Sequence, residues 1–148
     1  MGGFYPGKRL DIPVYTTSSS RKANGAKMSH TILVVEDQED SKRNMRNLLT
    51  SAGYDIIEAV TGEEGVTAAE INHPELILMD IQLPDFDGYE ATRRIKANLA
   101  LREIPIIAVT SYALSGDDAK AFDAGCDDYV SKPFSPRALL TKIREFLS

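Results

Sequence analysis

Short apolar runs and longer amphipathic stretches alternate along most of this chain. Most of the apolar runs are rich in Ile, Leu and Val and are bounded by polar or turn-forming residues. Such runs are typical of strands that are buried on both faces of a parallel sheet. The pattern therefore predicts five strands, at residues 31–35, 55–59, 76–80, 106–110 and 128–132.

The stretches after the strands carry apolar residues at intervals of three and four positions, which predicts amphipathic helices. The positions expected to face the core are Met45, Leu48, Leu49, Ala52, Val66, Ala69, Ile71, Thr92, Ile95, Leu99, Leu139, Ile143 and Phe146. Gly53 and Gly125 stand where two of these helices should end. Thr61 and Glu64 have the spacing of a capping box, and Ser135 is followed by Pro136 as at the start of a helix.

Strict alternation of strands and helices predicts an α/β fold with a parallel sheet covered on both faces. Right-handed crossovers restrict such a sheet to a few doubly wound strand orders. We predict the flavodoxin-like order 2-1-3-4-5 with five helices. In this arrangement the carboxyl ends of all five strands meet at one edge, where ligands of open α/β sheets bind.

The first 27 residues lack this periodicity and contain several Gly and Pro residues and a polar Thr/Ser run. They hold five basic residues and one acidic residue, which gives them a net charge of +4. Residues 28–148 have a net charge of −9, and the two parts add up to the net charge of −5 for the whole chain. We interpret residues 1–27 as a flexible basic leader, either an upstream extension before a functional start at Met28 or a vector-derived segment, in preference to a docking arm. The folded domain is then expected at residues 28–148.

Composition excludes several classes of protein. The single cysteine, Cys126, excludes an internal disulfide framework and fits a reducing compartment such as the cytoplasm. No apolar run approaches the roughly 20 residues that span a bilayer. The acidic domain does not favour direct binding to nucleic acid, which relies on Lys and Arg. The two histidines, His30 and His73, have no neighbours at metal-ligand spacing.

Polar side chains stand at the ends of the predicted strands: Glu36 and Asp37, then Asp80, Thr110 and Lys132. Three carboxylates at one sheet edge repel each other unless a cation neutralises them. All-oxygen ligands suit Mg²⁺ or Mn²⁺ better than zinc. An ammonium and a hydroxyl beside that cation would complete a receptor for the oxygens of a phosphoryl group on Asp80, and Asp is a known nucleophile in aspartyl-phosphate chemistry.

These strand ends carry motifs that resemble the receiver domain of two-component response regulators. The resemblance covers residues 29–148 and rests on four motifs: Val34-Val35-Glu36-Asp37, Leu78-Met79-Asp80-Ile81-Gln82-Leu83-Pro84 through Asp87-Gly88, Val109-Thr110-Ser111-Tyr112-Ala113, and Asp128-Tyr129-Val130-Ser131-Lys132-Pro133-Phe134. It implies that Asp80 is the phosphoacceptor. It also implies that Asp37 binds Mg²⁺ directly, Glu36 through water, and Gln82 through its backbone carbonyl.

The resemblance implies further roles in switching. Thr110 and Lys132 would contact the phosphoryl oxygens, and Tyr129 would be an aromatic switch that turns inward when Thr110 moves. A simpler alternative is that Tyr129 only packs against the last helix. The Lys132–Pro133 peptide bond would be cis. Gln82 and Tyr112 would flank the path of the water that cleaves the acyl phosphate, so they would set its lifetime.

We therefore expect a response regulator of the stand-alone, single-domain type, because neither the leader nor the chain end provides an output domain. Its phosphohistidine donor would be a histidine kinase or a histidine phosphotransferase of a phosphorelay, and its output a protein that contacts the Tyr129 face. It would be a monomer or a phosphorylation-dependent dimer. Its only catalysis would be self-phosphorylation and autodephosphorylation.

Two alternatives stay open: a pseudo-receiver that acts as a scaffold without phosphorylation, and a receiver fragment of a hybrid histidine kinase. A hydrolase of the haloacid dehalogenase type also uses an Asp nucleophile on a parallel sheet. It would need a second Asp two residues after the nucleophile, where this chain has Gln82.

Overall fold

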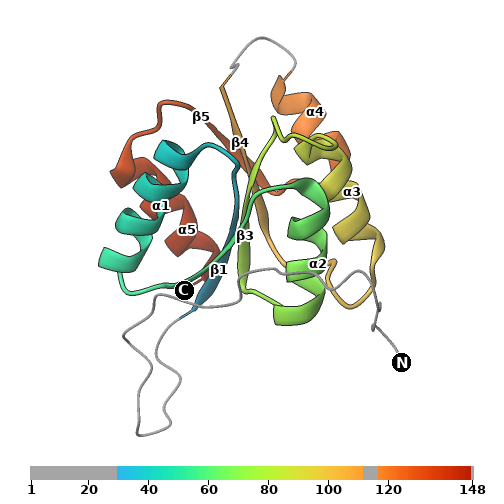
Figure 1. The fold of residues 1–148 in the computed structure, drawn as a ribbon, viewed down its shortest axis with the longest axis horizontal. Helices are drawn as coiled ribbons and strands as arrows, with labels where there is room; N and C mark the ends of the chain where they lie inside the picture. Colours follow the sequence, from blue (N-terminus) through green and yellow to red (C-terminus); the bar gives the residue numbers. More distant parts are fainter. Residues whose placement is uncertain (1–29, 112–116, 148) are drawn as a thin grey trace, which may run out of the picture.

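The structure is a computed structural model that describes residues 30–111 and 117–147 (Figure 1). The predicted leader, Met28 and Tyr112 lie outside the described residues. Within the described part of the chain, no helix is both long and apolar enough to cross a membrane.

One parallel sheet forms the centre of the fold. Its strands are listed here in chain order: β1 (Thr31–Val35), β2 (Asp55–Ala59), β3 (Leu76–Asp80), β4 (Ile106–Thr110) and β5 (Asp128–Ser131). They lie side by side in the order β2-β1-β3-β4-β5, which confirms the predicted fold class. The fifth strand ends at Ser131, one residue before the predicted end at Lys132.

Helices cover both faces of the sheet. They are α1 (Glu39–Ser51), α2 (Gly62–Asn72), α3 (Gly88–Ala97), α4 (Asp117–Ala124) and α5 (Pro136–Leu147). Figure 1 shows α1 and α5 on one side of the sheet and α2, α3 and α4 on the other. Because successive strand residues point to opposite faces, Ile32 and Val34 belong to the core beneath α1 and α5, whereas Leu33 and Val35 belong to the other core.

Local signals in the sequence mark the helix ends as predicted. Thr61 Oγ1 accepts from the Glu64 N–H at 3.0 Å, and the Glu64 carboxylate returns to accept from the Val60 N–H at 2.9 Å. Gly53 follows α1 with a φ of +96°, which a residue with a side chain rarely adopts. The Ser135 hydroxyl accepts from the Ala138 N–H at 3.3 Å at the start of α5.

Three apolar positions predicted to be buried are exposed: Ile71 at 60%, Leu99 at 74% and Phe146 at 37%. The buried face of α2 consists of the small residues Gly62, Gly65, Ala68 and Ala69, and it does not include Ile71. Leu99 lies beyond the last residue of α3, so the helical period no longer directs it, and Leu101 is buried instead. On α5 the buried stripe continues to the half-buried Leu147 rather than to its neighbour Phe146.

Candidate functional site

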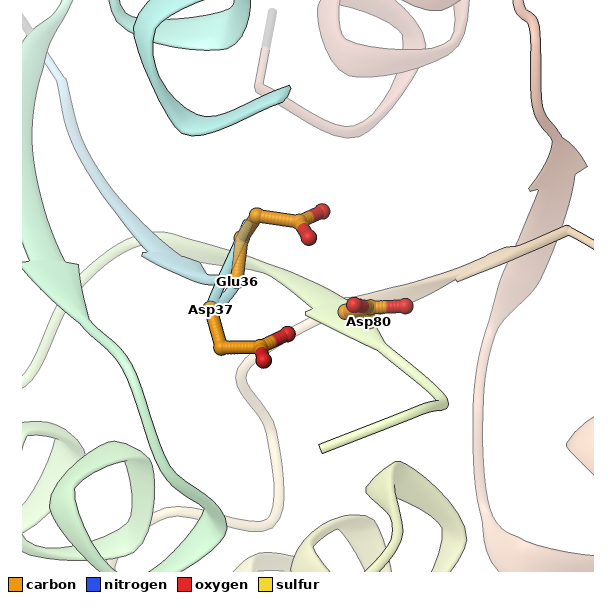
Figure 2. Close-up of side chains that lie close together, drawn as sticks. All are labelled: Glu36, Asp37 and Asp80. Carbon is orange, nitrogen blue, oxygen red and sulfur yellow. The ribbon is translucent and has the colours of Figure 1, made fainter. Parts of the chain in front are cut away.

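Three carboxylates converge at the carboxyl-terminal edge of the sheet. Asp80 is the last residue of β3, and Glu36 and Asp37 directly follow β1. Because β1 and β3 are adjacent and parallel, with Val35 opposite Met79, the two strand ends lie side by side. Figure 2 shows the three side chains directed into the same space, and one oxygen from each lies within 4.8 Å of the others. The sequence-predicted acidic cluster is therefore present as a spatial cluster.

The carboxylates differ in their exposure to solvent. Glu36 is fully buried and Asp80 is 3% exposed, whereas Asp37 is exposed. The Gln82 N–H donates to Asp80 Oδ1 at 3.2 Å, and the Gln38 N–H donates to Glu36 Oε2 at 3.3 Å. The other Glu36 oxygen, Oε1, is also buried, and its neighbour is the ammonium of Lys132. A buried carboxylate needs such a cation, because burial removes the water that would otherwise solvate its charge.

Lys132 supplies positive charge from the end of β5. Its Nζ lies 2.9 Å from Glu36 Oε1 and 3.8 Å from Asp80 Oδ2, so the ammonium is closer to Glu36 than to Asp80. Among the residues that the structure describes, the Lys132 ammonium is the cation paired with the cluster of three carboxylates. The cluster therefore keeps an excess of negative charge within a largely buried site, which is costly without a further cation.

This imbalance affects the protonation of Asp80. Burial raises the pKa of Asp80 to about 7, and the neighbouring Glu36 carboxylate adds to the rise, whereas Lys132 and the Gln82 amide act in the opposite direction. A small, hard divalent cation would reverse the effect, because it favours the ionised carboxylate. The donor set of carboxylate and backbone oxygens fits Mg²⁺.

Thr110 and Lys132 are placed by the pairing of β4 with β5. Thr110 ends β4, is 4% exposed and lies opposite Ser131. The Lys132 N–H donates to the Thr110 carbonyl at 2.7 Å, and the peptide bond that follows, between Lys132 and Pro133, is cis. Since β4 is the neighbour of β3, with Val109 opposite Asp80, both residues stand at the edge that carries the carboxylates.

Tyr129 lies on β5, three residues before Lys132. It is half-buried and packs against the core beneath α2, α3 and α4. Its ring meets the ring of Phe122 on α4 edge to face, with centroids 6.3 Å apart and planes at 86°. The aromatic partner of Tyr129 thus comes from α4, on the face opposite to the last helix.

A groove of about 690 Å³ lies between α1 and the segment that follows β5. It is bounded by Asn44 and Leu48 of α1 and by Pro133 and Phe134 after β5, and Lys132 lies in its wall. The groove therefore lies beside the lysine of the site. It is large enough to admit a side chain from another protein.

Asp85, in the loop after β3, and Gly88, the first residue of α3, also matter here. The sequence analysis named Gly88 only as part of a motif and assigned no role to Asp85. A Cβ on Gly88 would overlap the Asp80 carbonyl oxygen and lie 2.9 Å from Ile81 Cα, so only glycine fits so close to the site. Asp85 accepts hydrogen bonds from the first two residues of α2. The Gly88 spacing is visible in the sequence, but the partner of Asp85 is more than 20 residues away, and no sequence signal identifies it.

Comparison with known proteins gives a consistent result. The family model of the response regulator receiver domain matches residues 32–144. The polar-differentiation response regulator DivK of Brucella ovis is 40% identical over 120 residues, which are 81% of this chain and 98% of DivK.

Solved structures of receiver domains have the same fold. The receiver domain of the sensor histidine kinase PA1611 from Pseudomonas aeruginosa PAO1, described with a magnesium ion coordinated in its active site cleft, is 38% identical. Its TM-score is 0.76, over 81% of this chain and 98% of that one. A CheY-like response regulator receiver domain protein from Methanospirillum hungatei JF-1 is 35% identical with a TM-score of 0.74, over 81% and 94% of the two chains.

Proposed function

Because this chain belongs to the response regulator receiver family, we propose that it is a phosphorylation switch in which Asp80 accepts a phosphoryl group in the presence of Mg²⁺. The observation that carries this proposal is the convergence of Glu36, Asp37 and Lys132 on a nearly fully buried Asp80. Receiver domains are signalling modules, so the product of the reaction is a changed surface rather than a released metabolite.

The metal would be held by the carboxylates of Asp37 and Asp80 directly, by Glu36 through water, and by the backbone carbonyl of Gln82. The convergence of the three carboxylates and the raised pKa of Asp80 support this assignment, because the ammonium of Lys132 does not by itself balance the negative charge of the cluster. A bound Mg²⁺ supplies the positive charge that keeps Asp80 ionised and offsets the charge on the transferring phosphoryl oxygens.

The reaction is transfer from a phosphohistidine of a histidine kinase or histidine phosphotransferase. An oxygen of Asp80 forms the new O–P bond while the P–N bond to the donor breaks, and the donor imidazole takes up a proton as it leaves. Lys132, 3.8 Å from Asp80 Oδ2, is close enough to move onto a phosphoryl oxygen, and the Thr110 hydroxyl donates to another. The groove beside Lys132 provides a path for the donor side chain.

Phosphorylation would then alter the surface formed by α4 and β5. The phosphoryl group adds about −1.5 to −2 charges, which attract Lys132 and Thr110. Movement of Thr110 toward the phosphoryl group frees space for Tyr129 to turn inward, and this breaks its contact with Phe122, which is 49% exposed. An output protein or a second copy of the chain would recognise the changed surface.

Hydrolysis of the acyl phosphate ends the signal. We propose that Gln82, which is exposed, and Tyr112, which lies outside the described residues, set the lifetime of the phosphorylated state by controlling the access of water. This self-hydrolysis, together with self-phosphorylation, would be the only catalysis by the chain. We also propose that the protein acts in the cytoplasm.

A second candidate is a receiver that belongs to a hybrid histidine kinase. The similarity to the receiver domain of the PA1611 kinase favours it, since that domain is 38% identical to this chain. The chemistry at Asp80 would be the same, and the donor would be a histidine within the same protein or a phosphotransferase partner.

Intact-mass spectrometry after treatment with acetyl phosphate tests the proposal. We expect a gain of about 80 Da, one phosphoryl group, that requires Mg²⁺ and is absent in Asp80→Asn. Asp123→Asn removes an exposed carboxylate of α4 and should be labelled like the wild type. If the wild type gains no mass while a known receiver does, Asp80 is not a phosphoacceptor and the chain acts as a phosphorylation-independent scaffold.

A further inference from the structure

The loop after β3, residues 81–87, connects the phosphoacceptor to α3. It contains Gln82, whose backbone carbonyl is a ligand in the proposed metal site, so any displacement of the loop displaces that ligand. Backbone bonds hold its two ends: the Ile81 N–H donates to Val109 at 3.0 Å, and the Gly88 N–H donates to Ile81 at 2.8 Å. Between these ends, the Gln82 N–H donates to Asp80 Oδ1 at 3.2 Å, and side chains of the loop make contacts with α2 and α3.

Asp85 anchors the loop by reaching across to α2. Its Oδ1 accepts from the Gly62 N–H at 2.7 Å and its Oδ2 from the Glu63 N–H at 2.9 Å. These are the first two amides of the helix, whereas the cap residue of the helix, Thr61, serves the Glu64 N–H. The start of α2 therefore has two caps, one from its own segment and one from a loop 22 to 23 residues away.

The charge on Asp85 strengthens this contact. Partial burial alone would raise its pKa, but the amides of Glu63 and Gly62 outweigh that effect, and the pKa of Asp85 lies below its ordinary value. An ionised carboxylate at a helix N-terminus is favoured by the helix dipole and forms stronger hydrogen bonds than a neutral acceptor.

Phe86 anchors the loop at a second point. A Cβ on Gly62 would lie 2.6 Å from Cε1 of the Phe86 ring, so the ring occupies space that only a glycine leaves open. The Arg94 guanidinium of α3 lies 4.1 Å from the centroid of the same ring. The loop is thus fixed between the start of α2 and the side of α3.

The start of α2 packs closely against the end of β1. A Cβ on Gly65 would lie 2.8 Å from Val35 Cγ2, so the helix sits directly on the end of β1. Val35 immediately precedes Glu36 and Asp37. Asp85 therefore ties the loop after β3 to the element that lies against the end of β1, and the proposed metal ligands come from both places.

We propose that the contacts of Asp85 and Phe86 with Gly62 form a clamp on the loop. In this clamp Asp85 is a positioning residue, which holds the Gln82 carbonyl in place to bind Mg²⁺. This inference rests on the proposed function, because it concerns the same metal site. It predicts that loss of the clamp weakens Mg²⁺ binding by about tenfold, the lower end of the range for groups that orient metal ligands. The rate of phosphorylation at saturating Mg²⁺ should stay near that of the wild type.

The test compares wild type, Asp85→Ala, Gly62→Ala and the control Asp123→Ala. Mg²⁺ affinity is measured by calorimetry, and the rate of labelling with acetyl phosphate is measured across Mg²⁺ concentrations. Asp85→Ala and Gly62→Ala should both need about tenfold more Mg²⁺, and Asp123→Ala should match the wild type. Gly62→Ala matters because it displaces Phe86 without changing the charge of the protein.

Amide hydrogen exchange in the metal-free protein gives a readout that is independent of labelling. The Gly62 and Glu63 amides should exchange faster in Asp85→Ala than in the wild type. A general loss of folding would lower the maximal labelling rate instead of shifting the Mg²⁺ dependence, and it would overturn the positioning role.

The outcomes separate this inference from the proposed function. If the wild type binds Mg²⁺ and is labelled on Asp80 while both variants keep its Mg²⁺ affinity, the clamp is wrong and the proposed function stands. If only Asp85→Ala is affected, its charge rather than its position is responsible, and the clamp is again overturned. If the wild type neither binds Mg²⁺ nor is labelled, both fail.

Discussion

Replacement of Asp80 by Asn should stabilise the metal-free protein at neutral and alkaline pH. Asp80 is almost fully buried beside Glu36, and the ammonium of Lys132 lies closer to Glu36 than to Asp80. Asn removes one negative charge from this cluster, keeps an oxygen that can accept from the Gln82 N–H and offers an amide donor to Glu36. The variant therefore relieves repulsion without leaving the Gln82 N–H unbonded.

The size of the effect follows from the pKa of Asp80. The value rises from 3.8 to about 7 on folding, so the folded protein binds the proton more tightly than the unfolded chain. The contribution of Asp80 to stability is thus fully present below about pH 4 and is lost as pH rises through about 7. At about pH 8 the difference is worth on the order of 4 kcal/mol as an upper bound, because each pKa unit corresponds to about 1.4 kcal/mol.

Urea unfolding followed by far-ultraviolet circular dichroism measures this difference, with a chelator present. We expect Asp80→Asn to exceed the wild type by about 2–4 kcal/mol at about pH 8 and by less than about 1 kcal/mol near pH 4. Asp123→Asn, which changes an exposed carboxylate, should show no such dependence on pH. Saturating Mg²⁺ should stabilise the wild type more than Asp80→Asn, because the variant lacks a ligand.

A gain that is the same at both pH values would refute the reasoning, since the pKa of Asp80 would then not be raised on folding. A loss of stability at about pH 8 would refute it more strongly. It would mean that Lys132 compensates the charge of Asp80 better than the two distances suggest.

Three further predictions concern single residues. Gly88→Ala should lower the free energy of unfolding by about 2 kcal/mol or more and slow phosphorylation, because the new Cβ meets the Asp80 carbonyl oxygen; urea unfolding and mass spectrometry measure both effects. Arg46→Ala should lower the free energy of unfolding by about 2–3 kcal/mol, because it leaves the charge of the buried Glu58 without the guanidinium. Glu58 is 8% exposed and accepts two hydrogen bonds from that guanidinium, at 2.6 and 3.2 Å. Adding Glu58→Gln should recover part of the loss, as measured by urea unfolding. Cys126 should react with a thiol reagent only as fast as the protein opens, since burial raises the pKa of its thiol to about 11, and fast labelling of the folded protein would contradict this.

Local periodicity made the elements predictable. Each strand needs only a short apolar run, and each helix needs only apolar residues at three- and four-residue intervals. Both signals lie within one segment of the chain, and the observed strands agree with the predicted ones except at Ser131. The placement of Glu36, Asp80 and Thr110 at one edge of the sheet was also predictable, because parallel strands share one carboxyl-terminal edge wherever they stand in the sheet.

Burial at the helix ends was less predictable. Ile71, Leu99 and Phe146 fit the apolar period but are exposed, because the period identifies a face of a helix and does not say where the sheet beneath it stops. After α3, the side chain that is buried is that of Leu101, which lies outside the helical pattern.

The sequence by itself determined which side chains reach the edge of the sheet, since the strand that carries each one fixes its place. Only the tertiary structure decided how these groups share charge and what holds them. The preference of Lys132 for Glu36, the loop of Asp85 on the start of α2 and the ring of Phe86 against Gly62 are all contacts between distant segments. Such contacts depend on how segments that are far apart in the sequence pack together in the folded protein, and no pattern within one segment encodes them.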